Sequence, residues 1–343
     1  MNRRFARAVF GRLPAPVRQR LEHVRGARRP LRWSVRIGAP VGRQGDVWGD
    51  TAFAEDLAQA LRRRGQEVFV DRWDSRIRPD AGRPDDVTIT LRGLHLPPKE
   101  EGAVNILWVI SHPDMVSDDE IRSGYDLVFG ASESWAVART ASSGRTVVPL
   151  LQATNPDRFR PGPAADDLRS DVLFVGTTRE TFRPAVRDAI LAGFPPAIYG
   201  HGWEEFVDPA LIRANHLDNA RLPDAYRSAR IVLNDHWDDM KREGFLSNRL
   251  FDASAAGARI VSDAVDGLLD TFGPQVQTYS SVADLQRLLR DEVAWPPTDE
   301  LAAQAAFTAQ AHSFDRRAEQ LIDAVAPLVR RRMRPVRRAA SRG

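Results

Sequence analysis

Short apolar runs alternate with helical patterns through most of the chain, and this alternation constrains the fold more than any other feature. A first series of such runs lies between Leu31 and Leu151, and a second lies between Asp171 and Glu292. In the first series, residues 52–65 carry apolar side chains at helical spacing and end at Gly65. Buried strands spaced by helices form parallel sheets that are covered on both faces. The sequence therefore predicts an α/β fold with two doubly wound, Rossmann-like domains.

The two series are separated by residues 151–170, which contain three prolines and no apolar period. This interruption predicts a linker, and a last helical pattern predicts a terminal helix. The expected division is a basic arm (1–30), an N-terminal domain (31–155), a linker (156–168), a C-terminal domain (169–312), a terminal helix (313–329) and a basic tail (330–343).

Charge is distributed very unevenly along the 343 residues. Residues 1–36 carry a formal charge of +10 and residues 324–343 carry +7, so the part between them is acidic. This pattern argues against a general nucleic-acid binder, because the basic residues lie outside the folded part. The sequence of the basic arm, residues 1–30, indicates either a partly disordered segment or a segment that lies on an anionic membrane surface.

Several classes of protein are excluded by composition. The chain has no cysteine, which rules out disulfides and thiolate metal sites. No apolar run reaches the roughly 20 residues of a membrane span, and no apolar stretch follows the basic N-terminus as in a secretory signal. We therefore expect a cytoplasmic protein, peripheral on the inner face of the membrane if the basic ends bind it.

The stretch from Ser247 to Gly257 is the strongest candidate for a ligand site. Ser247 is a good helix N-cap, and Gly257 suits the position just after the helix. A helix N-terminus favours a phosphate, and Asn248 and Arg249 add donors there. Asp252 lies about 7 Å further along the axis, at ~1.5 Å per residue, where a carboxylate can accept from ribose hydroxyls. The alternative is an ordinary capped helix with a surface Arg–Asp pair.

A second candidate phosphate site follows the first strand of the C-terminal domain. Gly176 permits a close approach, Thr177 and Arg179 can donate, and Arg183 lies one helical turn further. Guanidinium groups can stabilise a diphosphate leaving group without a metal ion. The alternative is a strand–helix turn with solvated arginines.

The N-terminal domain has its own glycine-rich loop after its first strand. The loop does not match the GxGxxG pattern, which disfavours a dinucleotide site. It can contact an acceptor or a donor phosphate, or it can be a plain capped turn. The candidate residues of this loop are Gly45, Gly49, Asp50 and Thr51.

His112 and Asp114 end an apolar strand, at the sheet edge where α/β proteins bind ligands. Either side chain can take a proton or bind a sugar hydroxyl, and both are the catalytic candidates, although a lone loop histidine is often structural. Similar candidates in the second domain are His201, Asn234 and His236. No metal-binding spacing of histidines or carboxylates occurs, so we expect no metal cofactor.

Several motifs together resemble one family. They are "DVLFVGTTRETFRPAVRDAI", "YGHGW", "LPDAYRSARIVLND", "SNRLFDASAAGARIVSD" and "HSFDRRAEQLI", which occur in this order between about Val148 and Asp323. They resemble the CgeB-like (spore-maturation-type) glycosyltransferases, which have the GT-B fold and are related to glycosyltransferase family four. The resemblance implies a nucleotide-sugar donor in the C-terminal domain, an acceptor on the N-terminal domain and a terminal helix returning to the first domain. Asp252 falls at the family's ribose-binding acid.

The residues and the resemblance together predict a metal-independent glycosyltransferase. It would move a sugar from a nucleotide donor to a hydroxyl of a glycan, a lipid-linked molecule or another acceptor. The family-four pattern has seven residues between two acids, whereas eight separate Glu243 from Asp252 here, which disfavours a sugar-contacting role for Glu243. Two alternatives stay open: a non-catalytic relative that binds nucleotide or glycan in an assembly complex, and a nucleotide-sugar isomerase or phosphorylase.

Overall fold

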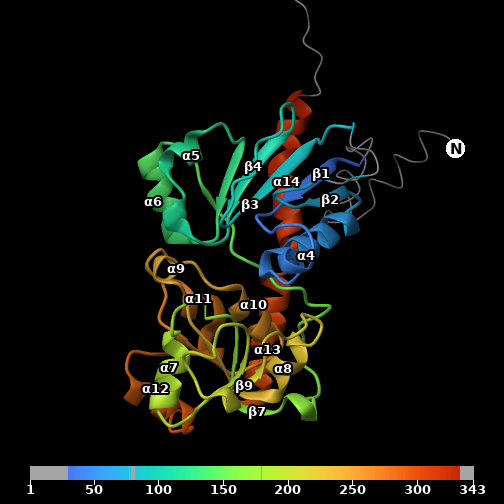
Figure 1. The fold of residues 1–343 in the computed structure, drawn as a ribbon. Coiled ribbons are helices and arrows are strands. Elements are labelled where there is room, and N and C mark those ends of the chain that lie inside the picture. The colour runs from blue at the N-terminus through green and yellow to red at the C-terminus, as the bar shows by residue number, and fades with distance from the viewer. Residues whose placement is uncertain (1–29, 77, 79–81, 179, 333–343) are drawn as a thin grey trace, which may run out of the picture.

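Two parallel six-stranded sheets form the framework of the molecule (Figure 1). The computed structural model describes residues 30–76, 78, 82–178 and 180–332. The first sheet has the order β2-β1-β3-β4-β5-β6. Its strands are β1 (Arg32–Arg36), β2 (Glu67–Asp71), β3 (Val87–Arg92), β4 (Val104–Val109), β5 (Leu127–Gly130) and β6 (Val148–Pro149).

The second sheet has the order β12-β11-β10-β7-β8-β9. Its strands are β7 (Ser170–Val175), β8 (Ala197–Tyr199), β9 (Ile212–Ala214), β10 (Ala229–Asn234), β11 (Ile260–Asp263) and β12 (Val276–Tyr279). Every strand pair in both sheets is parallel, as the alternation in the sequence predicts.

Helices lie on both sides of the sheets. In the N-terminal domain they are α3 (Arg43–Asp46), α4 (Gly49–Arg63), α5 (Asp118–Arg122) and α6 (Glu133–Ser143), with a short 3₁₀ turn, η1 (Pro113–Met115). In the rest of the chain they are α7 (Pro184–Leu191), α8 (Leu222–Ser228), α9 (Asp238–Arg242), α10 (Asn248–Ala255), α11 (Leu268–Phe272), α12 (Val282–Leu289), α13 (Thr298–Ala311) and α14 (Phe314–Arg332). None of the helices formed by the described residues combines the length and apolar character needed to cross a bilayer.

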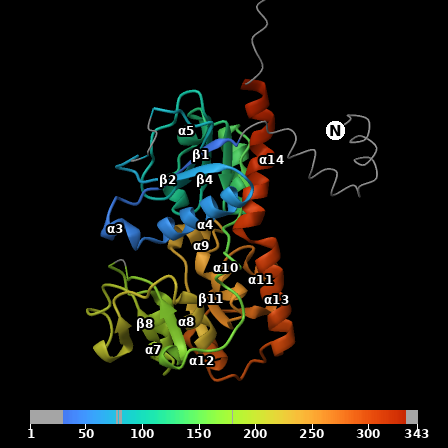
Figure 2. The same ribbon diagram turned by 90° about the vertical axis from the view of Figure 1, so that its right-hand side faces the viewer.

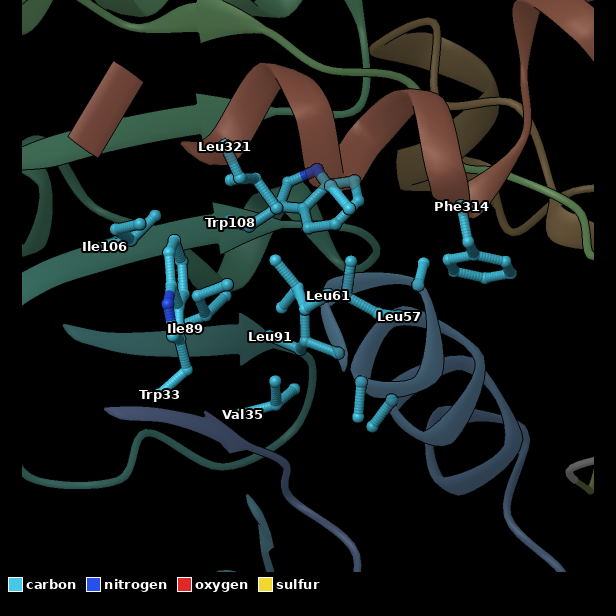
Figure 3. Packing of buried hydrophobic residues seen from close by; sticks show 14 of the residues in the cluster. Trp33, Val35, Leu57, Leu61, Ile89, Leu91, Ile106, Trp108, Phe314 and Leu321 are labelled. Carbon is cyan, nitrogen blue, oxygen red and sulfur yellow. The ribbon is translucent and has the colours of Figure 1, made fainter. Parts of the chain in front are cut away.

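The core of the N-terminal domain forms where α4 and α14 pack on one face of the sheet (Figure 3). Trp33 and Val35 of β1 point into this core together with Leu57 and Leu61 of α4. Each aliphatic side chain buried in this way contributes roughly 1.5–3 kcal/mol. The period-two pattern of β1 and the helical period of α4 thus determine which face each element buries.

The connection between β2 and β3 differs from the expected strand–helix alternation, because its described residues form no helix. Arg32 and Arg36 of β1 are instead buried on that face of the sheet beneath this connection. Arg78 reaches back to Asp71 and to Asp85, with Nη1 2.6 Å from an Asp85 oxygen. Buried charges of this kind require partners, and here ion pairs take the place of an apolar helix face.

The terminal helix α14 returns to the N-terminal domain, as predicted (Figure 2). Phe314 packs edge-on against Phe53 of α4 with ring centroids 4.7 Å apart, and Leu321 lies in the same core. Asp315 pairs with Arg63 at 2.7 Å. The preceding helix α13, which packs on α10, was not predicted. Its alanines lack the strong apolar stripe on which such predictions rest. The predicted fold class, with two doubly wound α/β domains and a returning helix, is confirmed.

The chain crosses between the domains twice, and the two crossing segments are joined by hydrogen bonds. The Thr154 N–H donates to the carbonyl of His312 at 2.9 Å, and the Phe314 N–H donates to the carbonyl of Thr154 at 3.0 Å. Arg317 is buried and donates to the carbonyls of Leu151 and Gln152 at 2.7 and 3.0 Å. These hydrogen bonds fix the position of one domain relative to the other.

Candidate active site

A cavity of about 300 Å³ lies between the domains and is lined by both. Its walls are loops and helix ends that follow the carboxyl ends of β1, β4, β7 and β10, where α/β sheets bind ligands. The N-terminal domain and the adjoining crossing segment contribute Gly49, Asp50, Phe53, Ile110, Ser111 and Gln152. The C-terminal domain contributes Gly176, Thr177, Arg183, Asp235, His236, Trp237, Met240, Ser247, Asn248 and Arg249.

The N-terminus of α10 forms part of the C-terminal wall. Ser247 is the N-cap residue, as predicted, but its side chain does not cap the helix. The Ser247 hydroxyl donates instead to Oδ1 of buried Asn234 at 2.6 Å. Asn234 in turn donates to the hydroxyl of Ser262 at 2.9 Å. The side chain of Asn234 therefore orients the start of α10 from the neighbouring strand β10.

Arg249 lies in the first turn of α10 and lines the cavity. Its Nε and Nη2 donate to the carbonyl of Val175 at 3.1 and 2.6 Å, and Nη1 donates to Asn234 at 2.8 Å. Burial lowers the pKa of the guanidinium, although a nearby tyrosine acts in the opposite direction. A partly desolvated cation at a helix N-terminus is a favourable place for an anionic group.

Gly176 is a glycine because Arg249 passes so close to it. A Cβ at this position would lie 2.9 Å from Nη2 of Arg249 and 3.2 Å from the ring of Phe174. The backbone of Gly176 is itself crowded by Gly200, whose added Cβ would lie 2.1 Å from the Gly176 carbonyl oxygen. The two glycines thus allow β7, β8 and the arginine to meet at one point.

Arg183 also lines the cavity, but its guanidinium is already paired. Two of its nitrogens donate to the Asp235 carboxylate, Nε at 3.1 Å, and Nη1 donates to the carbonyl of Thr177 at 3.1 Å. The side chains of Arg183 and Asp235 are 9 % and 1 % exposed. Arg183 therefore neutralises a buried carboxylate, and it can offer only its remaining N–H groups to a ligand.

His236 lines the cavity, but its side chain is buried and both of its ring nitrogens are bonded to protein groups. Its Nε2 accepts the N–H of Ser247 at 3.1 Å, so the ring proton lies on Nδ1, 2.7 Å from Asp263. Burial acts to raise the pKa of Asp263, but the hydrogen bond from His236 and the nearby charge of Lys241 hold that pKa below its ordinary value. His236 is thus a positioning residue that ties the entrance of α10 to the end of β11.

Asp252 lies outside the cavity lining and is 8 % exposed. It accepts from the hydroxyl of Thr154 at 2.7 Å and from Nδ2 of Asn248 at 2.8 Å. Burial raises its pKa to about 8, and the charge of Asp56 acts in the same direction, whereas the bond from Thr154 opposes it. Asp252 therefore touches the site through Asn248, and its direct contact with a ribose stays a prediction.

Relative to the natural protein, Asp252→Asn is expected to be more stable at pH 9 than at pH 5 by about 4 kcal/mol, at ~1.4 kcal/mol for each of the roughly three pH units between 5 and the folded pKa. The folded pKa of about 8 lies above the ordinary value of 3.8. The stability from the protonated carboxyl is therefore complete below pH 3.8 and is lost as the pH rises through 8. Denaturant unfolding of both proteins at the two pH values measures the difference. An effect of Asp252→Asn that is the same at both pH values would contradict the assignment.

The other predicted residues are distributed around the cavity. Gly49, Asp50 and Thr177 line it. The loop residues Gly45 and Thr51 support it instead, since the Thr51 hydroxyl donates to the Gly45 carbonyl at 2.7 Å. His201 is exposed and is not among the lining residues. Arg179 lies outside the described residues.

The two catalytic candidates lie at the domain contact beside the cavity. His112 has a left-handed backbone conformation, and its ring centroid is 5.9 Å from that of Trp237 in the other domain. Asp114 forms an ion pair with Arg242, also across the domains. Neither residue is among those that line the cavity. Both positions favour a role in joining the domains, and the predicted role in catalysis is untested.

Sequence reasoning missed an apolar contact between the two domains that includes the cavity-lining residue Met240. Phe245 and Met240 of the C-terminal domain are buried in a cluster with Trp135 of α6, whose ring is 5.5 Å from that of Phe245. The Ser132 hydroxyl donates to the carbonyl of Glu243 at 2.6 Å beside this contact. The only sign of this contact in the sequence is that Trp135 and Phe245 are aromatic. Local sequence patterns cannot show that two residues more than a hundred positions apart are in contact.

Comparison with known proteins agrees with this geometry. Residues 177–323 match the sequence profile of a family described as glycosyl transferase-like. A search of curated proteins finds no match. Among solved structures, AviGT4, a glycosyltransferase involved in avilamycin A biosynthesis, is 17% identical with a TM-score of 0.57, covering 88% of this chain and 98% of that one.

Two further structures have the same fold. Sucrose-phosphate synthase from Thermosynechococcus elongatus is 15% identical with a TM-score of 0.60, covering 88% of this chain and 100% of that one. T4 phage BGT in complex with UDP and Mn²⁺ is 10% identical with a TM-score of 0.54, covering 86% and 99%. The profile match and the fold together identify the chain as an enzyme of the glycosyltransferase class with the GT-B fold. The finer likeness to CgeB-like enzymes stays a prediction.

Proposed function

We propose that this enzyme transfers a hexosyl or related sugar from a nucleotide-sugar donor to a hydroxyl of an acceptor, without a metal ion. The observation that carries the proposal is the start of α10, where Arg249 and the helix N-terminus line the interdomain cavity. A diphosphate placed there meets a guanidinium and the partial positive charge of the helix. The charge that develops on the leaving group is stabilised by the same groups.

Asn248 supports a donor sugar or ribose at the same place. Its Oδ1 is buried and accepts no hydrogen bond from the described residues, while its Nδ2 is held by Asp252. An unpaired buried acceptor costs about 1–3 kcal/mol, so a hydroxyl that donates to it gains affinity. Asp252 thereby fixes the amide orientation that a donor hydroxyl would need.

In this proposal Asp50 is the general base that takes the proton of the acceptor hydroxyl. Asp50 lines the cavity from the N-terminal domain, whereas Arg183 and Arg249 line it from the C-terminal domain. In the transfer step the acceptor oxygen bonds to the anomeric carbon and gives its proton to Asp50. The bond to the diphosphate breaks, and its electron pair leaves on the diphosphate oxygen.

Asp50→Asn is expected to lower kcat for transfer by roughly 100-fold or more, the usual scale of a lost general base. The Kd for the nucleoside diphosphate should change little. The matched control is Asp114→Asn, which removes only an exposed interdomain ion pair and should lower kcat less than about threefold. A larger loss for Asp114→Asn than for Asp50→Asn would return the catalytic assignment to Asp114.

Metal independence is tested by chelation. We expect transfer to continue at an unchanged rate in EDTA. In this proposal the positive charge next to the diphosphate comes from Arg249 and from the partial charge of the helix N-terminus, which line the cavity. Initial rates with and without EDTA, and with added Mg²⁺ or Mn²⁺, measure this. Loss of activity in EDTA with rescue by either ion would overturn the prediction, and the Mn²⁺ complex of T4 phage BGT makes the test necessary.

The proposed function is tested first by a thermal-shift screen of UDP-, GDP-, ADP-, dTDP- and CMP-sugars. The donor that stabilises the protein is then incubated with it without an acceptor, and release of the nucleoside diphosphate by slow hydrolysis is measured. Stabilisation with release of the nucleoside diphosphate supports a transferase. Stabilisation without any turnover supports the non-catalytic relative, and an isomerised sugar nucleotide as product supports an isomerase.

Two predictions remain. One is that the acceptor is a glycan or a lipid-linked molecule, and the other is that the basic ends attach the protein to an anionic membrane. Most of both ends lies outside the described residues. Flotation with anionic and neutral vesicles at low salt tests the attachment, which electrostatic attraction would restrict to the anionic vesicles.

A further inference from the structure

Exposed apolar side chains gather at one edge of the N-terminal domain. Among the described residues, eleven large apolar side chains are well exposed, and six of them lie in the segments that follow β1, β2, β3 and β4. Single exposed apolar residues are normal, but a concentration at one edge marks a binding surface. The six, each 45–50 % exposed, are Val41, Val47, Trp73, Leu94, Leu96 and Met115.

Three of these segments are in direct contact. The ring of Trp73 stacks on that of exposed His95 with centroids 5.0 Å apart and planes 18° apart. The Trp73 N–H donates to the carbonyl of Ala39 at 3.4 Å, and the Val41 N–H donates to Asp74 at 3.0 Å. We call these neighbouring exposed residues the apolar ledge. It consists of Val41, Val47, Trp73, Leu94, His95 and Leu96.

The ledge adjoins the cavity. A Cβ added to Gly93 would lie 3.1 Å from Oδ2 of Asp50 and 3.9 Å from the hydroxyl of Ser111, and both of these residues line the cavity. Leu94 is the next residue along the chain. Figure 2 shows α3, which precedes Val47, at the edge of this domain that faces the other one. A molecule whose hydroxyl reaches Asp50 therefore lies next to the segment that carries Leu94, His95 and Leu96.

Two arginines beside the ledge are held in ion pairs. Arg72 pairs with Asp46 at 2.6 Å, and Arg76 pairs with Glu100 at 2.7 Å. A glycan chain lying here could stack the CH face of one sugar on Trp73, but its hydroxyls would lie against the leucine and valine side chains. A flat apolar ring would instead extend the existing stack of Trp73 and His95 and cover the aliphatic side chains around it.

We propose that the acceptor is a hydroxylated planar aromatic aglycone that lies on Trp73 and His95 and presents its hydroxyl to Asp50. This inference rests on the proposed function, since it specifies the acceptor of the same transfer. The bonds formed and broken are those of that transfer, and the product is an aryl glycoside and a nucleoside diphosphate.

The test measures binding and transfer separately, on the full chain saturated with nucleoside diphosphate. The acceptor probes are 2-naphthol for the aromatic class, maltose for the glycan class and farnesol for the prenyl class. We expect calorimetry to show the tightest binding for 2-naphthol, with naphthyl glycoside formed when the sugar donor is supplied. Tighter binding of maltose or of farnesol would overturn the aromatic assignment.

Variants of Trp73 sharpen the test. Trp73→Ala should weaken 2-naphthol binding at least tenfold, and Trp73→Phe should restore most of it, because a flat ring remains. Leu269→Ser removes an equally exposed side chain, 55 % exposed, from the C-terminal domain and should change nothing. An unchanged melting temperature for Trp73→Ala excludes misfolding as the cause. An effect of Trp73→Ala below threefold would sink the proposal.

The outcome also separates this inference from the proposed function. If the enzyme binds a nucleoside diphosphate and releases it from the sugar donor but shows no preference for 2-naphthol, only the aromatic assignment fails. If no nucleoside diphosphate binds at all, the proposed function fails.

Discussion

Replacing Arg183 by leucine is expected to lower the free energy of unfolding by about 3–5 kcal/mol, the cost of leaving a buried charge without its partner. Asp235 is 3 % exposed as a residue, and both of its carboxylate oxygens accept from Arg183. Without the guanidinium, the carboxylate stays in a site of low dielectric with no cation bonded to it. Denaturant unfolding followed by circular dichroism measures the loss.

The double variant Arg183→Leu/Asp235→Asn is the matched control for this prediction. It removes both charges, so it should recover most of the lost stability. Acidification should also narrow the gap between the single and double variants, because an unpaired buried carboxylate binds a proton more readily. A single variant as stable as the natural protein at pH 8 would mean that water reaches Asp235 after all.

Replacing Arg249 by alanine should weaken binding of the nucleoside diphosphate by about 1.5–3 kcal/mol, or roughly 10- to 150-fold. The matching nucleoside, which lacks phosphates, should lose less than about threefold. The contrast arises because the guanidinium lines the cavity at the helix N-terminus, where an anion gains most. Calorimetry with both ligands at one ionic strength measures the two losses.

Two further variants make this result specific to the position of Arg249. Arg249→Lys keeps the charge but cannot hold Val175 and Asn234 with one planar group, so we expect an intermediate loss. Arg187→Ala removes an exposed arginine of α7 that pairs with Asp188 and should have no effect on binding. Equal losses for the nucleoside and the diphosphate would show that Arg249 does not contact the phosphates.

Periodicity in the sequence was enough to predict most of the framework. The apolar runs predicted parallel strands, and the stripes of residues 52–65 and 313–329 predicted the helices that are α4 and α14. These predictions succeed because the side-chain period reports directly which face an element buries. The strand–helix alternation is interrupted between β2 and β3, where buried arginines that read locally as surface charge cover the sheet.

The sequence by itself also determined which residue types stand at the carboxyl ends of the strands, because strand ends follow from the same periodicity. Gly176 was named for its place after a strand, Asp50 for its glycine-rich loop, and Asn248 and Arg249 for the start of a helix, and all four line the cavity. What each polar side chain does there was decided only by the tertiary structure. Asp252 meets Thr154, 98 positions away, and Asp114 meets Arg242, 128 positions away. A residue's hydrogen bonds and charge state depend on the partners that folding brings to it, and local spacing carries no information about partners so far along the chain.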